Sequence, residues 1–394
     1  MGSSILNQQI NMTAMTSDPA GLMTAEEASE RLGVRPASLY AYVSRGRIRA
    51  LPHPSDPRAR LYRRDDVEAL IAQKQRQARP ASAAATALDW GLPVLTTALG
   101  SIAGGRLTYR GQDAALLSET ATLEGIADLL WGVEGTAFRG RALRAMPEAG
   151  SPIDRAVAAL AAELPDSLPG EQGARLAARA ARLVRIIGSA AAGRWFPEAP
   201  LHQALAATWQ APAAENAIRR ALVLVADHEL NASTFAVRVA ASTGAPLTHA
   251  LIAGLVTLAG PLHGGATDRV AAFLDEVQHL GDPAAAVHAR LARGDGLPGF
   301  GHRLYPSGDP RAAALLAAVP LGAADRALLE AVETATGQKP SIDVALVLVE
   351  RVYRLPRRSA LALFATGRSV GWIAHAMEQA ASGQLIRPRA VFSG

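Results

Sequence analysis

Cysteine is absent from the 394-residue sequence, which excludes disulfide bonds, thiolate metal sites, iron–sulfur clusters and cysteine nucleophiles. Aromatic residues make up only 5% of the chain, so alanine-rich helices are free to pack closely. No apolar run reaches the roughly 20 residues of a membrane span; the longest extends from Ala250 to Leu262. The first residues lack a secretory signal, and Leu6 breaks the myristoylation pattern. These absences predict a cytoplasmic protein with no membrane partner.

The residues that are present have an ordinary globular balance, with 49% hydrophobic and 19% charged, which excludes a wholly disordered chain. The length predicts two or three domains. Basic residues exceed acidic ones by 40 − 35 = 5, but the excess is uneven. Between positions 31 and 64 a single acid, Asp56, stands against nine arginines, at positions 31, 35, 45, 47, 49, 58, 60, 63 and 64. A basic segment on a nearly neutral body predicts a module that binds a polyanion.

The N-terminal part of the chain has the signals of a small helical module. Residues 1–20 are polar, and we expect them to be disordered. Thr24 and Glu27 form a capping box that begins a helix, which Gly33 ends. Pro36 suits the first turn of a second helix.

Two short strands and a third helix complete this module. The strands are expected at 48–51 and 60–62, and Asp65 is expected to cap the third helix. The order of helix, turn, helix, β-wing and helix predicts a winged helix-turn-helix domain over residues 21–75. Its candidate DNA-contacting residues lie on the second helix: Ser38, Tyr40, Tyr42 and Arg45. The alternative is a solvated surface or a module that docks a protein.

A linker is predicted at residues 76–90, where the sequence turns polar and then rich in alanine and serine. From there to residue 394 helical periodicity dominates, alternating strand patterns are scarce, and no repeat has a fixed period. Helices are expected at 123–131, 154–163, 174–190, 214–226, 268–280, 311–318, 344–353 and 369–380. The fold class is therefore mainly α.

Two histidines of this body lie in glycine-rich turns. His263 follows an apolar helix in Gly260-Pro-Leu-His-Gly-Gly-Ala, where free N–H groups would favour a neutral histidine that stabilises negative charge. The alternative is a histidine satisfied within an interhelical turn. His302 lies between glycines and a charged neighbour, where it can polarise a carbonyl. Downstream, Asp309 reads as a helix cap and Pro310 as the first helical residue, which fixes Arg311 as a carboxylate clamp.

One acid and two further cations complete the candidate set. Asp343 lies in the first turn of a predicted helix, where the helix dipole favours its ionised form, as a general base requires. The alternative is an aspartate that only stabilises the helix. Arg368 and Arg387 supply cations, and the segment 227–234 is a polar cluster that contains His228. This set contains an acid, histidines and arginines, and its spacing is not that of metal ligands. These are the groups that carbon–carbon bond formation on a polycarboxylate needs.

Several segments, in this order, resemble the signature segments of the citrate synthase family. They are TYRGQDAALL and LEGIADLLWG, then DHELNAST, PLHGGA, GFGHRLYPSGDPRA, GRSVGWIAH and LIRPR. The resemblance covers about residues 91–394 and implies a helical fold with a large domain and a small one, the latter at roughly 267–360. It also implies a homodimer, the tricarboxylic acid cycle reaction of oxaloacetate with acetyl-CoA as co-substrate, and no metal or other cofactor. Residues 21–75 resemble the MerR/excisionase-type winged helix-turn-helix domains.

The citrate synthase resemblance assigns a role to each site residue. Asp343 would deprotonate the acetyl methyl group, His263 would stabilise the enol, and His302 would polarise the oxaloacetate carbonyl. The carboxylates of oxaloacetate and citrate would be bound by His228, Arg311, Arg368 and, from the partner subunit, Arg387. Pro306-Ser307-Gly308 replaces the basic stretch that often meets CoA phosphates, so acetyl- and propionyl-CoA both stay open as donors. The alternative function is a DNA-binding regulator whose body senses oxaloacetate, citrate or acyl-CoA with little turnover.

Overall fold

The computed structural model describes residues 21–34, 36–44, 47–53, 56, 59–78, 95–136, 138, 147, 150–195 and 200–390. The chain divides into two compact units: Met1–Val94 with Arg389–Gly394, here called the head, and Leu95–Pro388, here called the body. The predicted disordered segment 1–20, Arg45 and most of the predicted linker lie outside the described residues. No helix in the described part of the chain combines the length and apolarity of a membrane span.

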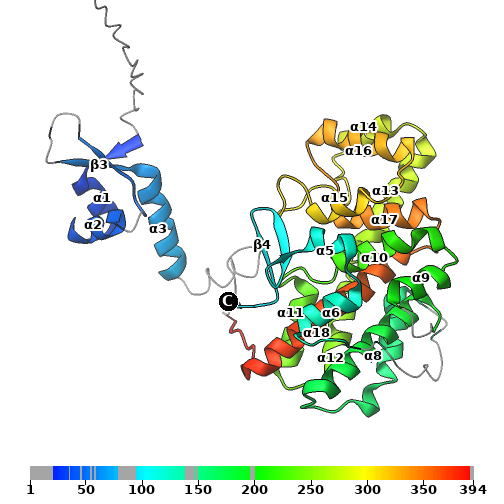
Figure 1. The fold of residues 1–394 in the computed structure, drawn as a ribbon. Coiled ribbons are helices and arrows are strands. Elements are labelled where there is room, and N and C mark those ends of the chain that lie inside the picture. The colour runs from blue at the N-terminus through cyan, green and yellow to red at the C-terminus, as the bar shows by residue number, and fades with distance from the viewer. Residues whose placement is uncertain are drawn as a thin grey trace, which may run out of the picture. The chain divides into compact units, whose positions relative to one another are not determined.

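The head is a three-stranded antiparallel sheet with three helices (Figure 1). Its elements are β1 (Leu22–Met23), α1 (Ala25–Leu32), α2 (Pro36–Ser44), β2 (Ala50–Pro52), β3 (Arg60–Arg63) and α3 (Arg64–Ala78). The predicted capping box of Thr24 and Glu27 is confirmed, with the Thr24 side chain accepting from the Glu27 N–H. The buried core gathers residues from β1, β3 and the three helices, among them Met23, Leu39, Tyr62 and Val67, and the half-buried Ala50 of β2 packs against it.

The head differs from the sequence-based expectation in four details. Strand β1 was not predicted, because two residues are too few for a pattern. Strand β2 begins at Ala50 rather than at residue 48. Helix α3 follows β3 directly, so Asp65 lies in its first turn and does not cap it. The same helix continues to Ala78, three residues into the predicted linker, which its polar but helix-compatible sequence permits.

The body is mainly α-helical, as predicted, with one small sheet of β4 (Gly100–Ala103), β5 (Arg106–Tyr109) and β6 (Gln112–Asp113). Its first helices are α5 (Ala114–Thr120), α6 (Leu123–Trp131), α7 (Pro152–Ala161), α8 (Gly173–Ala192), α9 (Leu201–Thr208), α10 (Glu215–Leu224), α11 (Ala232–Ser242) and α12 (Leu247–Leu258). The remaining ones are α13 (Ala266–Leu280), α14 (Pro283–Ala292), α15 (Pro310–Leu316), α16 (Ala323–Thr336), α17 (Ile342–Val352) and α18 (Ser359–Ser382). Short 3-10 turns occupy Leu164–Asp166 and Pro212–Ala214.

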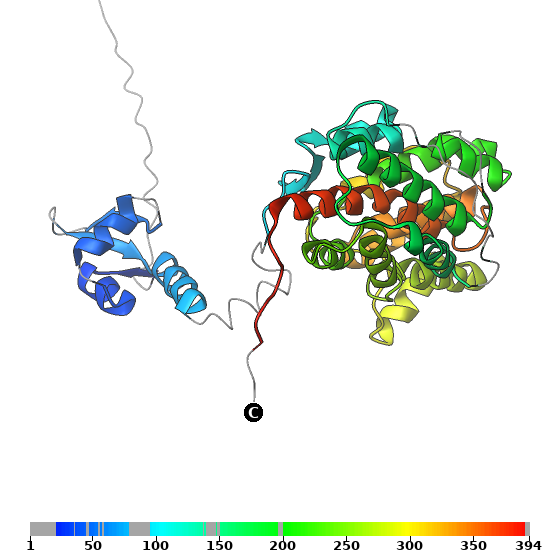
Figure 2. The same ribbon diagram turned by 90° about the horizontal axis from the view of Figure 1, so that it is seen from below.

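Helix α18 runs through the middle of the body, in contact with α6, α7, α8, α10, α11, α12 and α17 (Figure 2). It begins at Ser359, ten residues before its predicted start at 369, because its first turns are apolar all round and show no periodicity. Two glycines let it approach the segment after α10. A Cβ at Gly367 would lie 2.5 Å from Val225 Cγ2, and one at Gly371 would lie 2.2 Å from the Ala226 oxygen. This close approach brings α18 to the residues of the candidate site.

Helices α13 to α17 pack on one another and form the part of the body drawn from yellow-green to orange in Figure 1. They span most of the predicted small domain at roughly 267–360. Its separation from the rest of the body stays a prediction. These helices and their connections carry His302, Arg311 and Asp343, whereas His228 and Arg368 belong to the other part of the body.

Candidate active site

His228 and His302 meet where the connection after α10 faces the connection before α15. Their ring centres are 5.5 Å apart and nearly perpendicular. His228 is buried, and its Nε2 lies 3.0 Å from the hydroxyl of Tyr305. Burial and the nearby cations Arg311 and Arg368 hold the pKa of His228 well below its usual value. His228 is therefore neutral at physiological pH.

His302 has a defined tautomer. Its Nδ1 accepts the N–H of Leu304 at 3.2 Å, so in the neutral ring the proton is on Nε2. Burial and then the positive charge of Arg311 lower the pKa of His302. A neutral histidine with an Nε2–H can donate a hydrogen bond to a carbonyl oxygen, which fits the role predicted from the sequence.

Arg311 begins α15 as predicted, because Asp309 caps the helix and accepts the Arg311 N–H at 3.0 Å. The same carboxylate also accepts from Nε at 3.0 Å and from Nη2 at 2.8 Å. Burial alone would lower the pKa of Arg311, but the charge and hydrogen bonds of Asp309 raise it above its usual value. Arg311 is thus a permanent cation. Because Asp309 occupies the side of the guanidinium formed by Nε and Nη2, the Nη1 side is left to bind a carboxylate, which is a more restricted clamp than the sequence predicts.

Arg368 is a buried cation with an incomplete set of partners. It is 1% exposed; its Nε donates to the Val225 oxygen at 2.8 Å, and its guanidinium carbon lies 4.9 Å from the centre of the Phe364 ring. Its Nη2 is buried without a hydrogen-bond partner in the described structure. Burial lowers the pKa of Arg368 to about 10, so it stays charged near neutral pH. A buried, unpaired guanidinium donor is costly unless an anion completes it.

His263 lies in the turn after α12, with its Nε2 2.7 Å from the Ser233 hydroxyl. Burial, followed by the charge of Arg368, lowers its pKa to about 4, so the ring is neutral at pH 7. The expectation that the backbone N–H groups of this turn face a ligand is wrong for two of them. The N–H groups of His263 and Gly265 both donate to the Gly260 oxygen, at 2.9 and 3.2 Å.

The glycines of this turn are needed for compactness. A Cβ at Gly264 would lie 2.7 Å from Leu258 side-chain atoms, and one at Gly265 would lie 2.9 Å from the Ala259 oxygen. The glycine-rich pattern therefore indicates close backbone packing. The group that this turn supplies to the site is the side chain of His263.

Asp343 lies in the first turn of α17 as predicted. The Ser341 hydroxyl caps the helix and lies 3.3 Å from both the Asp343 N–H and its Oδ2. Burial raises the pKa of Asp343 and outweighs the opposing effect of Arg311. The sequence led us to expect that the helix terminus keeps the acid ionised, so the direction of the shift is a correction. A carboxylate of raised pKa is a stronger base once it is ionised.

One residue of the predicted active-site set is not brought to this site. Arg387 is exposed in the segment after α18, and no hydrogen bond or ion pair joins it to the described site residues. Its action in the site of a partner subunit stays a prediction. In the head, Ser38 and Tyr40 are exposed, but Tyr42 packs against the hydrophobic core, on a different side of α2 from Tyr40. Tyr42 and Tyr40 therefore do not share one DNA-facing surface.

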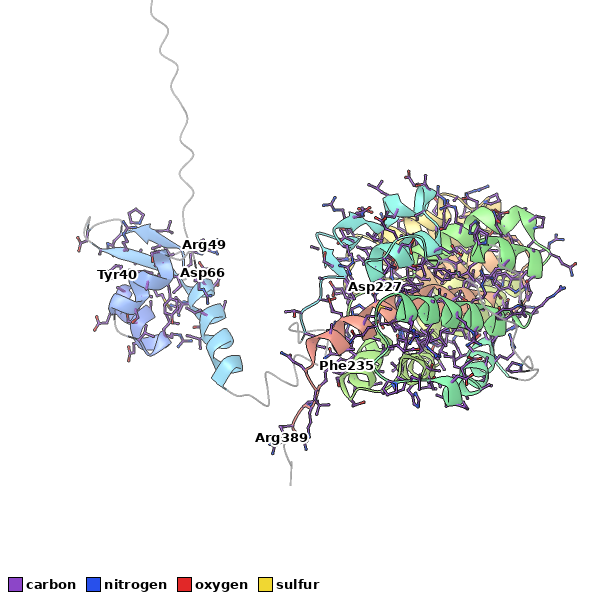
Figure 3. All side chains as sticks on the ribbon, turned by 60° about the horizontal axis from the view of Figure 1, so that its bottom comes forward. Tyr40, Arg49, Asp66, Asp227, Phe235 and Arg389 are labelled. Atoms are coloured by element: carbon purple, nitrogen blue, oxygen red, sulfur yellow. The ribbon has the colours of Figure 1, made fainter. Side chains whose placement is uncertain are left out.

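The charge excess of the head is smaller than the segment 31–64 indicates, because α3 carries three acids that neutralise arginines. Arg31 pairs with Glu68 at 2.6 Å and Arg63 with Asp65 at 3.3 Å. Arg49 pairs with Asp66 at 2.8 Å (Figure 3). Among the described arginines between positions 31 and 64, Arg47, Arg60 and Arg64 form no side-chain ion pair or hydrogen bond with another described residue. Their role as phosphate contacts stays a prediction.

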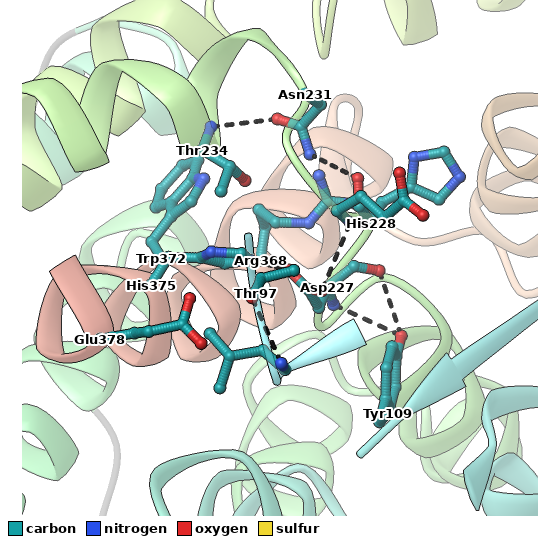
Figure 4. Close-up of polar contacts among 12 residues, drawn as sticks. Thr97, Tyr109, Asp227, His228, Asn231, Thr234, Arg368, Trp372, His375 and Glu378 are labelled. Atoms are coloured by element: carbon teal, nitrogen blue, oxygen red, sulfur yellow. Dashed lines mark hydrogen bonds and ion pairs between the residues drawn. The ribbon is translucent and has the colours of Figure 1, made fainter. Parts of the chain in front are cut away.

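Tyr305, Ser233 and Asp227 were not predicted as site residues, although all three lie inside the segments DHELNAST and GFGHRLYPSGDPRA. Tyr305 bonds His228, and Ser233 bonds His263. Asp227 is fully buried beside Arg368 (Figure 4). For Asp227 and Ser233 the signal in the sequence was a polar cluster within an otherwise apolar helical stretch, whereas Tyr305 lies in a polar, glycine-rich segment that gave no such signal.

Comparisons with known proteins agree with this arrangement of the chain. Residues 87–389 match the family described as citrate synthase, C-terminal domain, and residues 22–75 match a helix-turn-helix domain. The chain belongs to the citrate synthase family, whose members are condensing acyltransferases, and it carries an N-terminal helix-turn-helix domain.

Individual relatives show how far the similarity extends. A citrate synthase of Mycolicibacterium smegmatis is 30% identical over 77% of this chain and 94% of its own length. A 2-methylcitrate synthase of Mycobacterium tuberculosis is also 30% identical, over 77% of this chain and 89% of its own. A putative citrate synthase 2 of Mycobacterium bovis is 42% identical, but only over 44% of this chain and 49% of its own length. The chain thus spans about half the length of this last relative.

The solved structures share the fold of the body. Citrate synthase from Thermotoga maritima superposes with a TM-score of 0.64 at 25% identity, over 77% of this chain and 94% of the other. A ternary complex of carboxymethyl coenzyme A and oxaloacetate with citrate synthase from Thermoplasma acidophilum gives the same TM-score, identity and coverage.

Proposed function

We propose that the body condenses oxaloacetate with acetyl-CoA and water to give citrate and CoA. The observation that carries this proposal is the buried Nη2 of Arg368 without a partner, in a site with three neutral histidines. One carboxylate of oxaloacetate accepts a hydrogen bond from Nη2 of Arg368. His228 and the Nη1 side of Arg311 also bind the oxaloacetate dianion. Arg387 of a second copy of the chain supplies a further cation.

The first step is proton removal from the acetyl methyl group. Asp343 takes the proton, and the electron pair of the broken C–H bond moves toward the thioester oxygen to give an enolate, whose oxygen accepts a hydrogen bond from a ring N–H of His263. If that N–H is on Nδ1, Nε2 accepts from Ser233. The Ser233 hydroxyl can turn to His263 or to Asn231 Oδ1, which lies 2.8 Å away.

In the second step the enolate carbon attacks the ketone carbon of oxaloacetate. The Nε2–H of His302 donates a hydrogen bond to the ketone oxygen as this becomes an alkoxide; the alkoxide then takes a proton from water, and Asp343 returns its proton to the solvent. Water then cleaves the citryl-CoA thioester at the same site, which gives citrate and free CoA. The propionyl group is the alternative substrate, in line with the relative named 2-methylcitrate synthase.

Release of free CoA tests this proposal, measured with a thiol reagent for acetyl-CoA and propionyl-CoA with oxaloacetate. The expected result is CoA release that requires oxaloacetate, and the faster of the two thioesters identifies the acyl group. Oxaloacetate binding without release from either thioester would contradict catalysis. It would favour the alternative, in which the body is a sensor of oxaloacetate, citrate or acyl-CoA.

For the head we propose binding of duplex DNA, supported by the helix-turn-helix match and by the unpaired Arg47, Arg60 and Arg64. Each phosphate contact releases counterions, so affinity should fall steeply with salt. Replacing Arg47 by alanine should weaken binding and reduce the salt dependence, whereas Arg31→Ala, which removes an arginine already paired with Glu68, should change both less. Equal effects of the two substitutions, or no binding at low salt, would favour a protein-docking module.

A further inference from the structure

One face of α18 carries a line of buried polar side chains whose members the mechanism above uses only in part. Arg368, Trp372, His375 and Gln379 are spaced by three or four residues, so they share one side of the helix. They are 1%, 0%, 0% and 2% exposed. Arg368 belongs to the proposed oxaloacetate site and Trp372 donates to Ser233. His375 and Gln379 have no assigned role.

The proton positions along this line follow from the chemistry of Arg238, on the neighbouring helix α11. Its Nη1 lies 3.2 Å from His375 Nδ1, and a guanidinium can only donate. Nδ1 of His375 is therefore the acceptor, and the ring proton is on Nε2. That Nε2–H donates to Asp227 Oδ1 at 3.1 Å, so Arg238 fixes the tautomer that holds Asp227.

Asp227 is held rigidly beside the proposed substrate residues. A Cβ at Gly100 would lie 2.6 Å from its Oδ2, and one at Gly371 would lie 2.9 Å from its Oδ1, so two backbones enclose the carboxylate. Burial would raise its pKa, but His375 and then Arg368 lower it, which keeps Asp227 ionised. The hydroxyl of Tyr109 fixes its backbone, with both the Asp227 N–H and C=O at 3.3 Å (Figure 4).

Arg238 also connects this network to the first and last segments of the body. Arg238 Nη1 donates to Glu378 at 2.6 Å, and its Nε donates to Gln379 at 2.9 Å. Glu378 in turn accepts the N–H of Ala98, just before β4, at 2.8 Å. Gln379 donates to the oxygen of Gln384 at 2.8 Å, in the segment that leads to Arg387. One guanidinium thus ties the site to the first and last segments of the body.

We propose that Arg238 and His375 are positioning residues for oxaloacetate binding, an inference that rests on the proposed function. They hold Asp227 as the counter-ion of Arg368 and fix the start of the segment that carries His228. Neither residue touches the proposed substrate. With His375 gone, Asp227 Oδ1 loses its hydrogen-bond donor, while the Glu229 N–H, 3.3 Å from Oδ2, remains. The negative charge beside Arg368 is then less firmly fixed in position.

The test is oxaloacetate binding to the full chain by calorimetry, paired with steady-state kinetics. His375→Leu should raise the dissociation constant for oxaloacetate on the order of tenfold or more, since a hydrogen bond to a buried charge is lost. His375→Gln restores a donor for Asp227 and should recover most of that affinity. In both variants the KM for oxaloacetate should change more than kcat or the KM for acyl-CoA.

Two further variants guard against a purely structural effect. His202→Leu is the matched control, because His202 is also buried in the body but lies 3.7 Å from Glu215, outside the site. It should leave oxaloacetate affinity unchanged. Arg238→Lys keeps the charge but replaces two donor nitrogens, Nε and Nη1, by one ammonium nitrogen, so it should also weaken binding. This variant tests the inference if the leucine variant does not fold.

The outcomes separate this inference from the proposed function. Wild-type affinity in folded His375→Leu or Arg238→Lys would overturn the inference alone, and so would an equal loss in His202→Leu. No oxaloacetate binding by the wild-type chain would overturn both the inference and the proposed function.

Discussion

Replacing Asp343 by asparagine tests the assignment of the base, because it keeps the size of the side chain and removes its ability to accept a proton from carbon. Loss of a general base lowers the rate by about 10²–10⁴. At about 1.36 kcal/mol per factor of ten, this corresponds to roughly 3–5 kcal/mol of transition-state stabilisation. The affinity for oxaloacetate should barely change, because Arg311 and Arg368 are intact. Thiol detection of CoA measures the rate, and calorimetry measures the affinity.

The raised pKa of Asp343 also predicts how the Asp343→Asn substitution changes the stability of the fold. A carboxyl whose pKa is higher in the folded state than in the unfolded state destabilises the fold once pH exceeds both values. Asp343→Asn removes that penalty, so its melting temperature should exceed that of the wild type at neutral pH. The difference should shrink as pH falls below the raised pKa, where wild-type kcat also declines. A slow but destabilised variant would refute the buried-carboxylate reasoning, and a variant with wild-type kcat would refute the assignment.

The remaining predictions concern the cations and the assembly. Arg368→Gln should weaken oxaloacetate binding by about 10- to 100-fold, since a buried charge-assisted contact is lost, and an unchanged dissociation constant would contradict its role. Arg311→Ala should act in the same direction and also destabilise the body, because Asp309 would remain buried without its partner. The body should be a dimer at micromolar concentration by light scattering; a monomer would remove Arg387 from the site. Val256, 54% exposed on α12, is a candidate interface position, so Val256→Glu should shift any dimer toward monomer.

The sequence predicted those features that depend on residues close together in the chain. The capping box of Thr24, the Asp309 cap that places Arg311, and the first-turn position of Asp343 all arise within three or four residues, where local hydrogen bonding decides the conformation. Several helices of the body, among them α6, α8 and α13, followed from their periodicity in the same way. The apolar first half of α18 has no such periodicity, and its start was missed.

Features that join distant segments could not be predicted from spacing. The pairs of Arg31 with Glu68 and of Arg49 with Asp66 form only after α3 packs on the head, so counting charges along the sequence overstated its basic surface. The line from Arg238 through His375 to Asp227 joins three segments. Burial also decides the pKa of Asp343, and burial is a property of the folded chain that helix position alone does not give.

The most direct test of condensation is the fate of a labelled acetyl group. The full chain is incubated with oxaloacetate and acetyl-CoA carrying ¹³C in both acetyl carbons, and the products are followed by NMR. The account predicts citrate labelled in one methylene carbon and the adjoining carboxylate, in equal amount to the CoA released. Asp343→Asn should form this product far more slowly. CoA release with labelled acetate in place of citrate, or bound oxaloacetate with no labelled product from acetyl- or propionyl-CoA, would contradict the account.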